Sequence, residues 1–132
     1  MTRPTFAPRK LEEVNRAYAA VLAAGFATAD FPDQPEAETL QCRNELDRTN
    51  WLGLVVACQA NIAAGNPDGL TVIRCTSNHM YEVSYAETLG RMYVLLAQAQ
   101  AAQENWWRMK DQVRDALTNA DLRAIDLTEG WP

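Results

Sequence analysis

The length, composition and charge of the chain limit what it can be. Its 132 residues suffice for about one domain with its own core, and 48% hydrophobic with 22% charged residues is too apolar for a disordered protein. A net charge of −5, with twelve scattered Lys and Arg residues, argues against nucleic acid as the main partner, because phosphate binding needs a basic surface.

Two further features argue against the membrane-spanning and secreted classes. The longest apolar stretch, residues 51–65, is interrupted by Gln59 and Asn61 and is shorter than the roughly 20 residues that a span requires. Residues 1–14 carry charge without a following apolar core, so we expect no secretory signal. The odd number of cysteines without close pairs predicts reduced thiols and synthesis in the cytoplasm; the cysteines are Cys42, Cys58 and Cys75.

The first elements are an extended arm and a helix. Residues 1–9 contain Pro4 and Pro8 and read as the arm. The spacing of the apolar residues predicts a helix over 10–24, which Gly25 ends. Residues 26–38 then form a proline-containing loop.

A second helix is predicted over residues 35–64. Its C-terminal half is expected to be buried, whereas residues 39–50 are either exposed or packed through polar contacts. The apolar stripe consists of Leu40, Trp51, Leu54, Val55, Cys58 and Ile62.

A β-hairpin follows the breaker sequence at residues 65–69. The segments 70–75 and 80–84 are predicted strands joined by a turn, and such a hairpin must lie on the helices because it is marginal alone. The alternation leaves the buried face open: it is either Thr71, Ile73 and Cys75 or Leu70, Val72 and Arg74.

The longest element is a helix predicted from Tyr85 to about Leu117. Ser84 with Glu87 forms a capping-box pattern at its start. Roughly 33 residues would span about 50 Å, whereas a compact monomer of this size is about 30 Å across. The helix is therefore expected to project, to bend or to pack along a neighbour.

Apolar and small residues recur along this helix in the alternating 3–4 spacing of a coiled coil. The series is Leu89, Met92, Leu96, Ala99, Gln103, Trp106, Lys110, Val113 and Leu117. It allows either a bundle between chains or packing within one chain. For the first alternative, the predicted interface residues are Leu89, Met92, Leu96, Ala99, Gln103, Trp106, Trp107, Val113 and Trp131.

Trp106 and Trp107 are adjacent on this helix, so their side chains point about 100° apart and cannot share one stripe. Either a second chain or the C-terminal segment could cover one of them. Packing or an interface is favoured over carbohydrate binding. Thr118 with Asp121 repeats the capping pattern and starts a short last helix.

The residues that could carry chemistry do not form a recognisable site. Cys75 and His79 supply half a zinc site without a second pair, and they lack an orienting group for nucleophilic catalysis. Asp111, Asp115 and Asp121 fit a solvated helix face with interspersed opposite charges. The sequence therefore predicts no catalytic, metal or cofactor-binding residues, and a protein that is not an enzyme.

The C-terminal half carries the motifs "WWRMKDQVRDALT" and "LRAIDLTEGWP". Over residues 43–132 it resembles a bacteriophage-encoded family of domains of unknown function, frequent in tail-fibre and tail-fibre-assembly genes. The resemblance implies a role in the virion or its assembly and carries over no catalytic residue. The matching positions are Trp107, Lys110, Asp111, Ala116, Thr118, Leu122, Ile125, Asp126, Gly130, Trp131 and Pro132.

These features together predict an α+β fold that is mainly helical, with a long C-terminal helix, a second core helix and one β-hairpin. Residues 1–36 would form an N-terminal arm and short helix, a possible attachment segment, and residues 37–132 a helical domain into which 127–132 folds back onto the tandem tryptophans. The expected function is a structural tail protein of a phage or phage-like particle, in the fibre or its attachment. The alternative is a fibre-assembly chaperone absent from the mature virion. The expected partners are further copies of the chain, with a trimer favoured, and other tail proteins; the expected location is the virion tail, after synthesis in the host cytoplasm.

Overall fold

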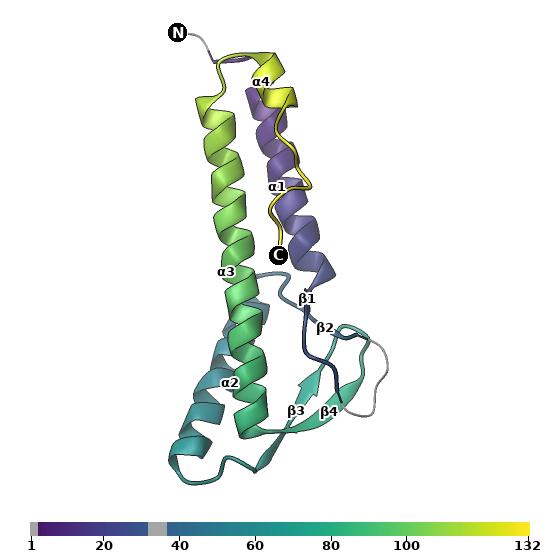
Figure 1. The fold of residues 1–132 in the computed structure, drawn as a ribbon, viewed down its shortest axis with the longest axis vertical. Helices are drawn as coiled ribbons and strands as arrows, with labels where there is room; N and C mark the ends of the chain where they lie inside the picture. The colour runs from purple at the N-terminus through teal and green to yellow at the C-terminus, as the bar shows by residue number, and fades with distance from the viewer. Residues whose placement is uncertain (1–2, 32–36) are drawn as a thin grey trace. The chain divides into compact units, whose positions relative to one another are not determined.

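The computed structural model describes residues 3–31 and 37–132 (Figure 1). Over these ranges it contains four helices and two antiparallel two-stranded sheets, which confirms the predicted α+β class dominated by helices. The chain forms two compact units. One, the terminal unit, combines residues up to Val21 with Gln100–Pro132, and the other, the central unit, is Leu22–Ala99.

Helix α1 spans Ala7–Ala24 and begins three residues earlier than predicted. Pro8, assigned from sequence to an extended arm, lies in the first turn of the helix. Proline is tolerated there because its missing N–H would have no partner within the helix. Gly25 ends α1 with a φ of 77°, as expected for a left-handed helix stop.

The predicted start of the second helix is wrong. Helix α2 spans Glu45–Ala63, and the Asn44 side chain caps it by accepting a hydrogen bond of 2.9 Å from the Asp47 amide. Part of the region predicted as helix forms strand β2 (Thr39–Leu40), which pairs with β1 (Phe26–Ala27); residues 35 and 36 lie outside the described ranges.

Pairing of β1 with β2 places Phe26 opposite Leu40, and both side chains are buried. The predicted division between residues 36 and 37 therefore falls inside the central unit. Within α2 itself, Val55 and Cys58 of the predicted stripe are buried.

The hairpin of β3 (Leu70–Arg74) and β4 (Met80–Ser84) is confirmed. The structure also decides which face is buried. Ile73 and Cys75 are inside, together with Val83 from β4, whereas Leu70, Val72 and Met80 are exposed.

Helix α3 spans Tyr85–Asp115 and ends two residues earlier than predicted. Ser84 Oγ accepts a 3.1 Å hydrogen bond from the Glu87 amide, as the capping pattern predicts, but the Glu87 carboxylate pairs with Arg91 instead of returning to the cap. The 31 residues of α3 are shared between the two units, with the change at residues 99–100. This division accounts for a helix too long for one compact core.

The buried stripe of α3 differs from the predicted series at several positions. Leu95, Ala102 and Met109 are buried where the prediction had Leu96, Gln103 and Lys110, which are only partly covered. The 3–4 spacing is compatible with either set, and at positions 102/103 and 109/110 the buried residue is the apolar or small member of the pair.

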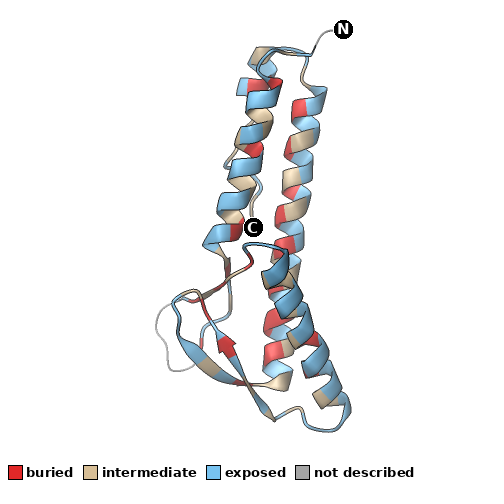
Figure 2. Ribbon diagram, turned by 180° about the vertical axis from the view of Figure 1, so that it is seen from behind, coloured by how far each residue is buried: buried red, intermediate tan, exposed pale blue. Residues whose placement is uncertain are grey.

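The terminal unit has its core between α1, α3 and the short helix α4 (Asn119–Arg123), and Figure 2 shows buried positions on the facing sides of α1 and α3. The predicted capping box at Thr118 and Asp121 is present in full. The buried side chains are Ala7, Val14, Met109, Val113 and Leu122.

The last residues fold back onto this core, as predicted. The Trp131 ring lies 6.3 Å from the Tyr18 ring, which stacks on Trp106 at 4.6 Å. The Trp131 indole N–H donates to the carbonyl of Leu127, and the buried Asn105 amide donates to the carbonyl of Glu129.

Gly130 is expected to be required for this docking. Its φ is 84°, and an added Cβ would lie 2.4 Å from Asn105 Oδ1. Gly130→Ala should therefore lower the free energy of unfolding by about 1–2 kcal/mol, measured by urea unfolding followed by circular dichroism. Gly53→Ala is the matched control, because in the described part of the chain no atom beyond the adjoining helix backbone lies within 4 Å of the added Cβ and the site is in a helix. The control should be stabilising by roughly 0.5–1 kcal/mol, and equal effects of the two substitutions would contradict the docking.

Candidate interaction site

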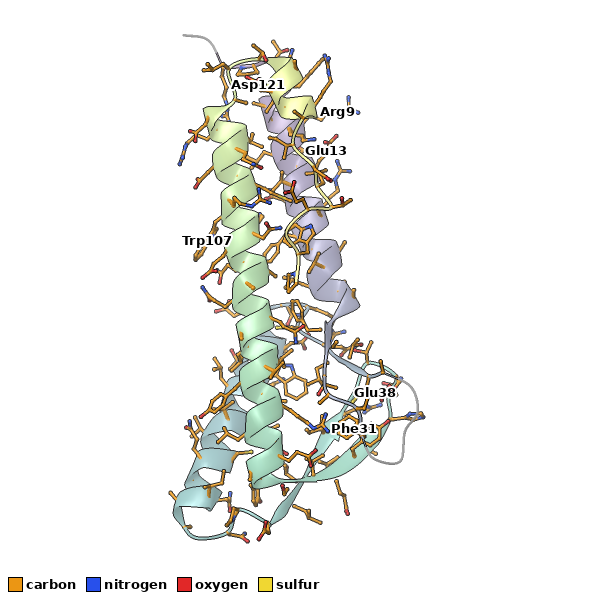
Figure 3. All side chains as sticks on the ribbon, viewed as in Figure 1. Arg9, Glu13, Phe31, Glu38, Trp107 and Asp121 are labelled. Carbon is orange, nitrogen blue, oxygen red and sulfur yellow. The ribbon has the colours of Figure 1, made fainter. Side chains whose placement is uncertain are left out.

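The tandem tryptophans of α3 serve different faces of the helix, as their spacing predicts. Trp106 packs against the core of the terminal unit, where its indole N–H donates to Asn15 Oδ1 at 2.9 Å and Lys110 Nζ lies 3.7 Å from its ring centre. Trp107 is 44% exposed and projects from the side of α3 away from α1 (Figure 3). Trp106 is therefore covered within the chain, at the core against which the C-terminal Trp131 also packs, and Trp107 is left available for contacts.

Trp107 borders a surface groove of the terminal unit with a volume of about 730 Å³. One wall is the face of α3 from Glu104 to Asp115, with Ala116 directly after the helix, and the other is formed by α4 and the segment that follows it. The lining consists of Glu104, Trp107, Arg108, Asp111, Gln112, Asp115, Ala116, Asp121, Ala124, Ile125, Asp126 and Glu129.

The charge of this groove is unusual for the chain. Six carboxylates and one guanidinium line it, so that its formal charge equals the net −5 of the whole protein. The remaining eleven acidic and eleven basic side chains cancel. When Arg114, which pairs with Asp111 and Asp115 from outside the lining, is counted as well, six carboxylates and two guanidiniums leave a formal charge of −4 at this site.

Several of these carboxylates have partners of their own. Arg114 pairs with Asp111 at 3.0 Å and with Asp115 at 3.1 Å, and these contacts raise the pKa of Arg114. This pairing confirms the interpretation of Asp111 and Asp115 as a helix face with interspersed charges. Such exposed pairs contribute little to stability, because water screens them.

The two acidic groups on the other wall are held by local turns. The Asp121 carboxylate accepts hydrogen bonds from the amides of Leu117 and Thr118. Hydrogen bonds from Thr128 lower the pKa of Asp126, which keeps this carboxylate ionised at neutral pH.

The carboxylates of Glu104 and Glu129 take little part in hydrogen bonds within the chain. The Glu104 carboxylate accepts a 3.3 Å hydrogen bond from Gln100, and Glu129 uses its main-chain carbonyl, not its carboxylate, to hold the C-terminal segment. Both residues are exposed. They are the groove carboxylates best able to contact a ligand.

The predicted interface residues are distributed over several environments. Trp107 alone among them lines the groove. Met92, Ala99 and Val113 are buried within the chain, so their side chains contact residues of the same chain in this conformation. The partly buried members are Leu89, Leu96, Gln103, Trp106 and Trp131.

Sequence reasoning missed most of the groove. Glu104, Arg108, Asp111 and Asp115 follow one another at helical spacing on one face, which was a usable signal for half of it. The other half, with Asp126 and Glu129, becomes adjacent only because the C-terminal segment folds back.

The central unit contains a separate polar cluster around Glu38. Its carboxylate accepts hydrogen bonds from Ser77 at 2.8 Å and Tyr81 at 2.9 Å, and the hydrogen bond from Ser77 is the main cause of a lowered Glu38 pKa. Burial, with a smaller contribution from Glu38, raises the pKa of the nearby Cys75 thiol to about 11. Figure 3 shows Glu38 on the same side of this unit as Phe31.

The three cysteines are buried and unpaired with one another, as predicted. Burial is also the main cause of the raised pKa of Cys42 and Cys58. All three thiols therefore stay protonated at neutral pH, and a protonated thiol is a poor nucleophile. Within the described ranges, His, Cys, Asp and Glu side chains do not gather in a group of three that could hold a metal ion.

A membrane span was not expected, and the described helices include none that is long and apolar enough to cross a bilayer.

Comparison with known proteins gives one family. Neither the curated proteins nor the solved structures contain a match to this chain. The model of a domain of unknown function, DUF4376, matches residues 6–129. The match includes α1, which lies outside the resemblance over residues 43–132. It also covers all residues that line the groove and the C-terminal segment up to residue 129. The chain therefore belongs to the DUF4376 family of domains of unknown function.

Proposed function

We propose that this protein is a structural component of a bacteriophage or phage-like tail, in the fibre or its attachment, and that it acts through protein–protein contacts and not through catalysis. The phage setting rests on the resemblance of its C-terminal motifs. The role in binding is supported by a groove with an exposed indole, and by thiols that burial keeps protonated.

The observation that carries the proposal is the position of the residues behind the resemblance. Trp107, Asp111, Ala116, Ile125 and Asp126 all line the groove. A second set builds the docked segment that forms its far wall: Thr118 caps α4, Leu122 enters the core, Gly130 adopts a positive φ and Trp131 packs against the core. The motif residues therefore either line the groove or hold the segment that forms its second wall.

We further propose that the protein is a homo-oligomer, with a trimer favoured. Helix α2 supports self-association, because residues 49–65 carry no charged side chain and yet Leu52 and Val56 are exposed. Sedimentation should give a mass of several chains at micromolar concentration, and a strict monomer would count against the oligomer.

Purified virions provide the test of the tail assignment. Mass spectrometry should find the protein in fixed copy number relative to the other tail proteins. Absence from virions, with presence in infected cells, would reject the structural role in favour of an assembly chaperone. The exposed outer face of the hairpin, with Leu70, Val72 and Met80, is the observation that favours this second candidate, because such a surface suits transient binding of an apolar segment.

A further inference from the structure

We propose that the groove bordered by Trp107 binds a segment of a partner protein that carries several lysine or arginine side chains. The inference rests on the proposed function in one respect, that the partner is a protein.

The net negative charge of the groove predicts a positively charged ligand. Six carboxylates line the groove against Arg108 in the lining and Arg114 beside Asp111 and Asp115, and the remaining negative charge attracts cations and repels acidic segments. Glu104 and Glu129 stand on opposite walls of the groove with exposed carboxylates, so a cationic side chain lying in it would find acceptors on both sides.

The distance between the carboxylates along α3 predicts an extended ligand. Glu104 and Asp115 are eleven residues apart on α3, which corresponds to about 16 Å along the helix. Within the described residues these carboxylates do not converge as metal ligands would. A chain with cationic groups at intervals matches this spacing better than a single ion does.

The apolar surface of the groove favours a peptide. Trp107 offers an exposed ring to a guanidinium or ammonium group, and Ala124 and Ile125 can cover the aliphatic stems of lysine and arginine. A ligand with both an apolar stem and a cationic end would use both parts of the lining.

The test uses the whole protein and fluorescein-labelled peptides read by fluorescence anisotropy. A peptide of alternating lysine and alanine should bind, and a glutamine–alanine peptide of the same length should not. Raising the salt from low concentration to about 150 mM should weaken binding, because the contacts are exposed. Unlabelled spermidine should compete much more weakly than unlabelled lysine–alanine peptide.

Matched variants locate the site. E104Q/E129Q removes two groove charges from exposed side chains and should weaken binding about fivefold or more, whereas D68N/E82Q removes two exposed charges of the central unit and should change it less than about twofold. Trp107→Ala should weaken binding by about fivefold. Circular dichroism should show that all of these variants are folded.

Three results would overturn the inference. One is failure of the lysine–alanine peptide to bind at low salt, and another is an equal loss in the two double variants. The third is an oligomer, seen by sedimentation, that E104Q/E129Q dissociates, because the groove would then be covered by a second copy of the chain. The two proposals can fail separately. If the protein is absent from virions but binds the lysine–alanine peptide in the groove, the tail assignment is rejected and this inference is retained.

Discussion

Replacing Arg91 by alanine should lower the free energy of unfolding by about 3 kcal/mol. The Arg91 side chain is only 5% exposed, and it contacts residues 28–31, the segment that follows β1. It donates to Thr28 Oγ1 at 2.9 Å and to the main-chain carbonyls of Ala29 and Asp30, and its guanidinium lies 3.9 Å from the centre of the Phe31 ring.

The relative size of these contacts explains the expected value. The ion pair with Glu87 contributes little, because the Glu87 side chain is 50% exposed and water screens it. Hydrogen bonds from a charged donor contribute about 1.5–3 kcal/mol, and the contact with Phe31 adds about 1 kcal/mol. Arg91 Nε has no hydrogen-bond partner among residues 3–31 and 37–132, which offsets part of the gain.

Two variants make the Arg91 experiment decisive. Arg91→Lys should recover only part of the stability, because one ammonium group cannot reach the acceptors that a planar guanidinium serves together. Arg74→Ala, at an exposed arginine with a 3.3 Å hydrogen bond to Asn78, should change stability by less than about 0.5 kcal/mol. Urea unfolding of all three variants, followed by circular dichroism, gives the comparison. Equal losses for Arg91→Ala and Arg74→Ala would show that Arg91 does not hold the segment.

Arg91 also shows what the sequence could not provide. Periodicity places position 91 beside the buried Met92, but a charged residue there reads as exposed. Its acceptors include two main-chain carbonyls, which carry no signature in the sequence. Burial of this cation depends on a loop conformation that only the folded chain defines.

Helix α2 shows a different kind of miss, because a local signal was present. Asn44 followed three residues later by Asp47 is a helix-start pattern, and the helix does begin at Glu45. The helical composition of residues 35–44 extended the prediction too far. The pairing of Leu40 with Phe26 is a contact between distant residues, and it overrides the local preference.

Local signals succeeded where side chain and backbone act within a few residues. The hairpin, the Thr118 capping box, the Gly25 stop and the divergence of Trp106 from Trp107 were all predictable. The groove was predictable only along α3. Its second wall requires the C-terminal segment to dock, and the exact neighbours of that segment follow from tertiary packing.

The docking can be measured through Trp131. Trp131→Ala should lower the free energy of unfolding by about 2–3 kcal/mol, less than the roughly 3–5 kcal/mol typical of a fully buried large aromatic side chain, because this indole is only partly buried. The substitution removes the ring near Tyr18 and the hydrogen bond of 2.8 Å to the Leu127 carbonyl. Trp107→Ala is the control with the same chemistry, and its loss should stay below about 1 kcal/mol because this side chain is 44% exposed and lies outside the core. Circular dichroism is the appropriate signal, since both substitutions change the fluorescence.

The two tryptophan variants also separate support of the groove from contact with its ligand. Trp131 does not line the groove, but it anchors the segment that brings Ile125, Asp126 and Glu129 opposite α3. Loosening that segment should disperse half of the negative charge, because the far-wall carboxylates would no longer face Glu104 and Asp111. Trp131→Ala should therefore reduce both stability and binding of the lysine–alanine peptide, whereas Trp107→Ala should reduce binding alone. Unchanged binding in a destabilised Trp131→Ala protein would show that the groove does not need the docked segment.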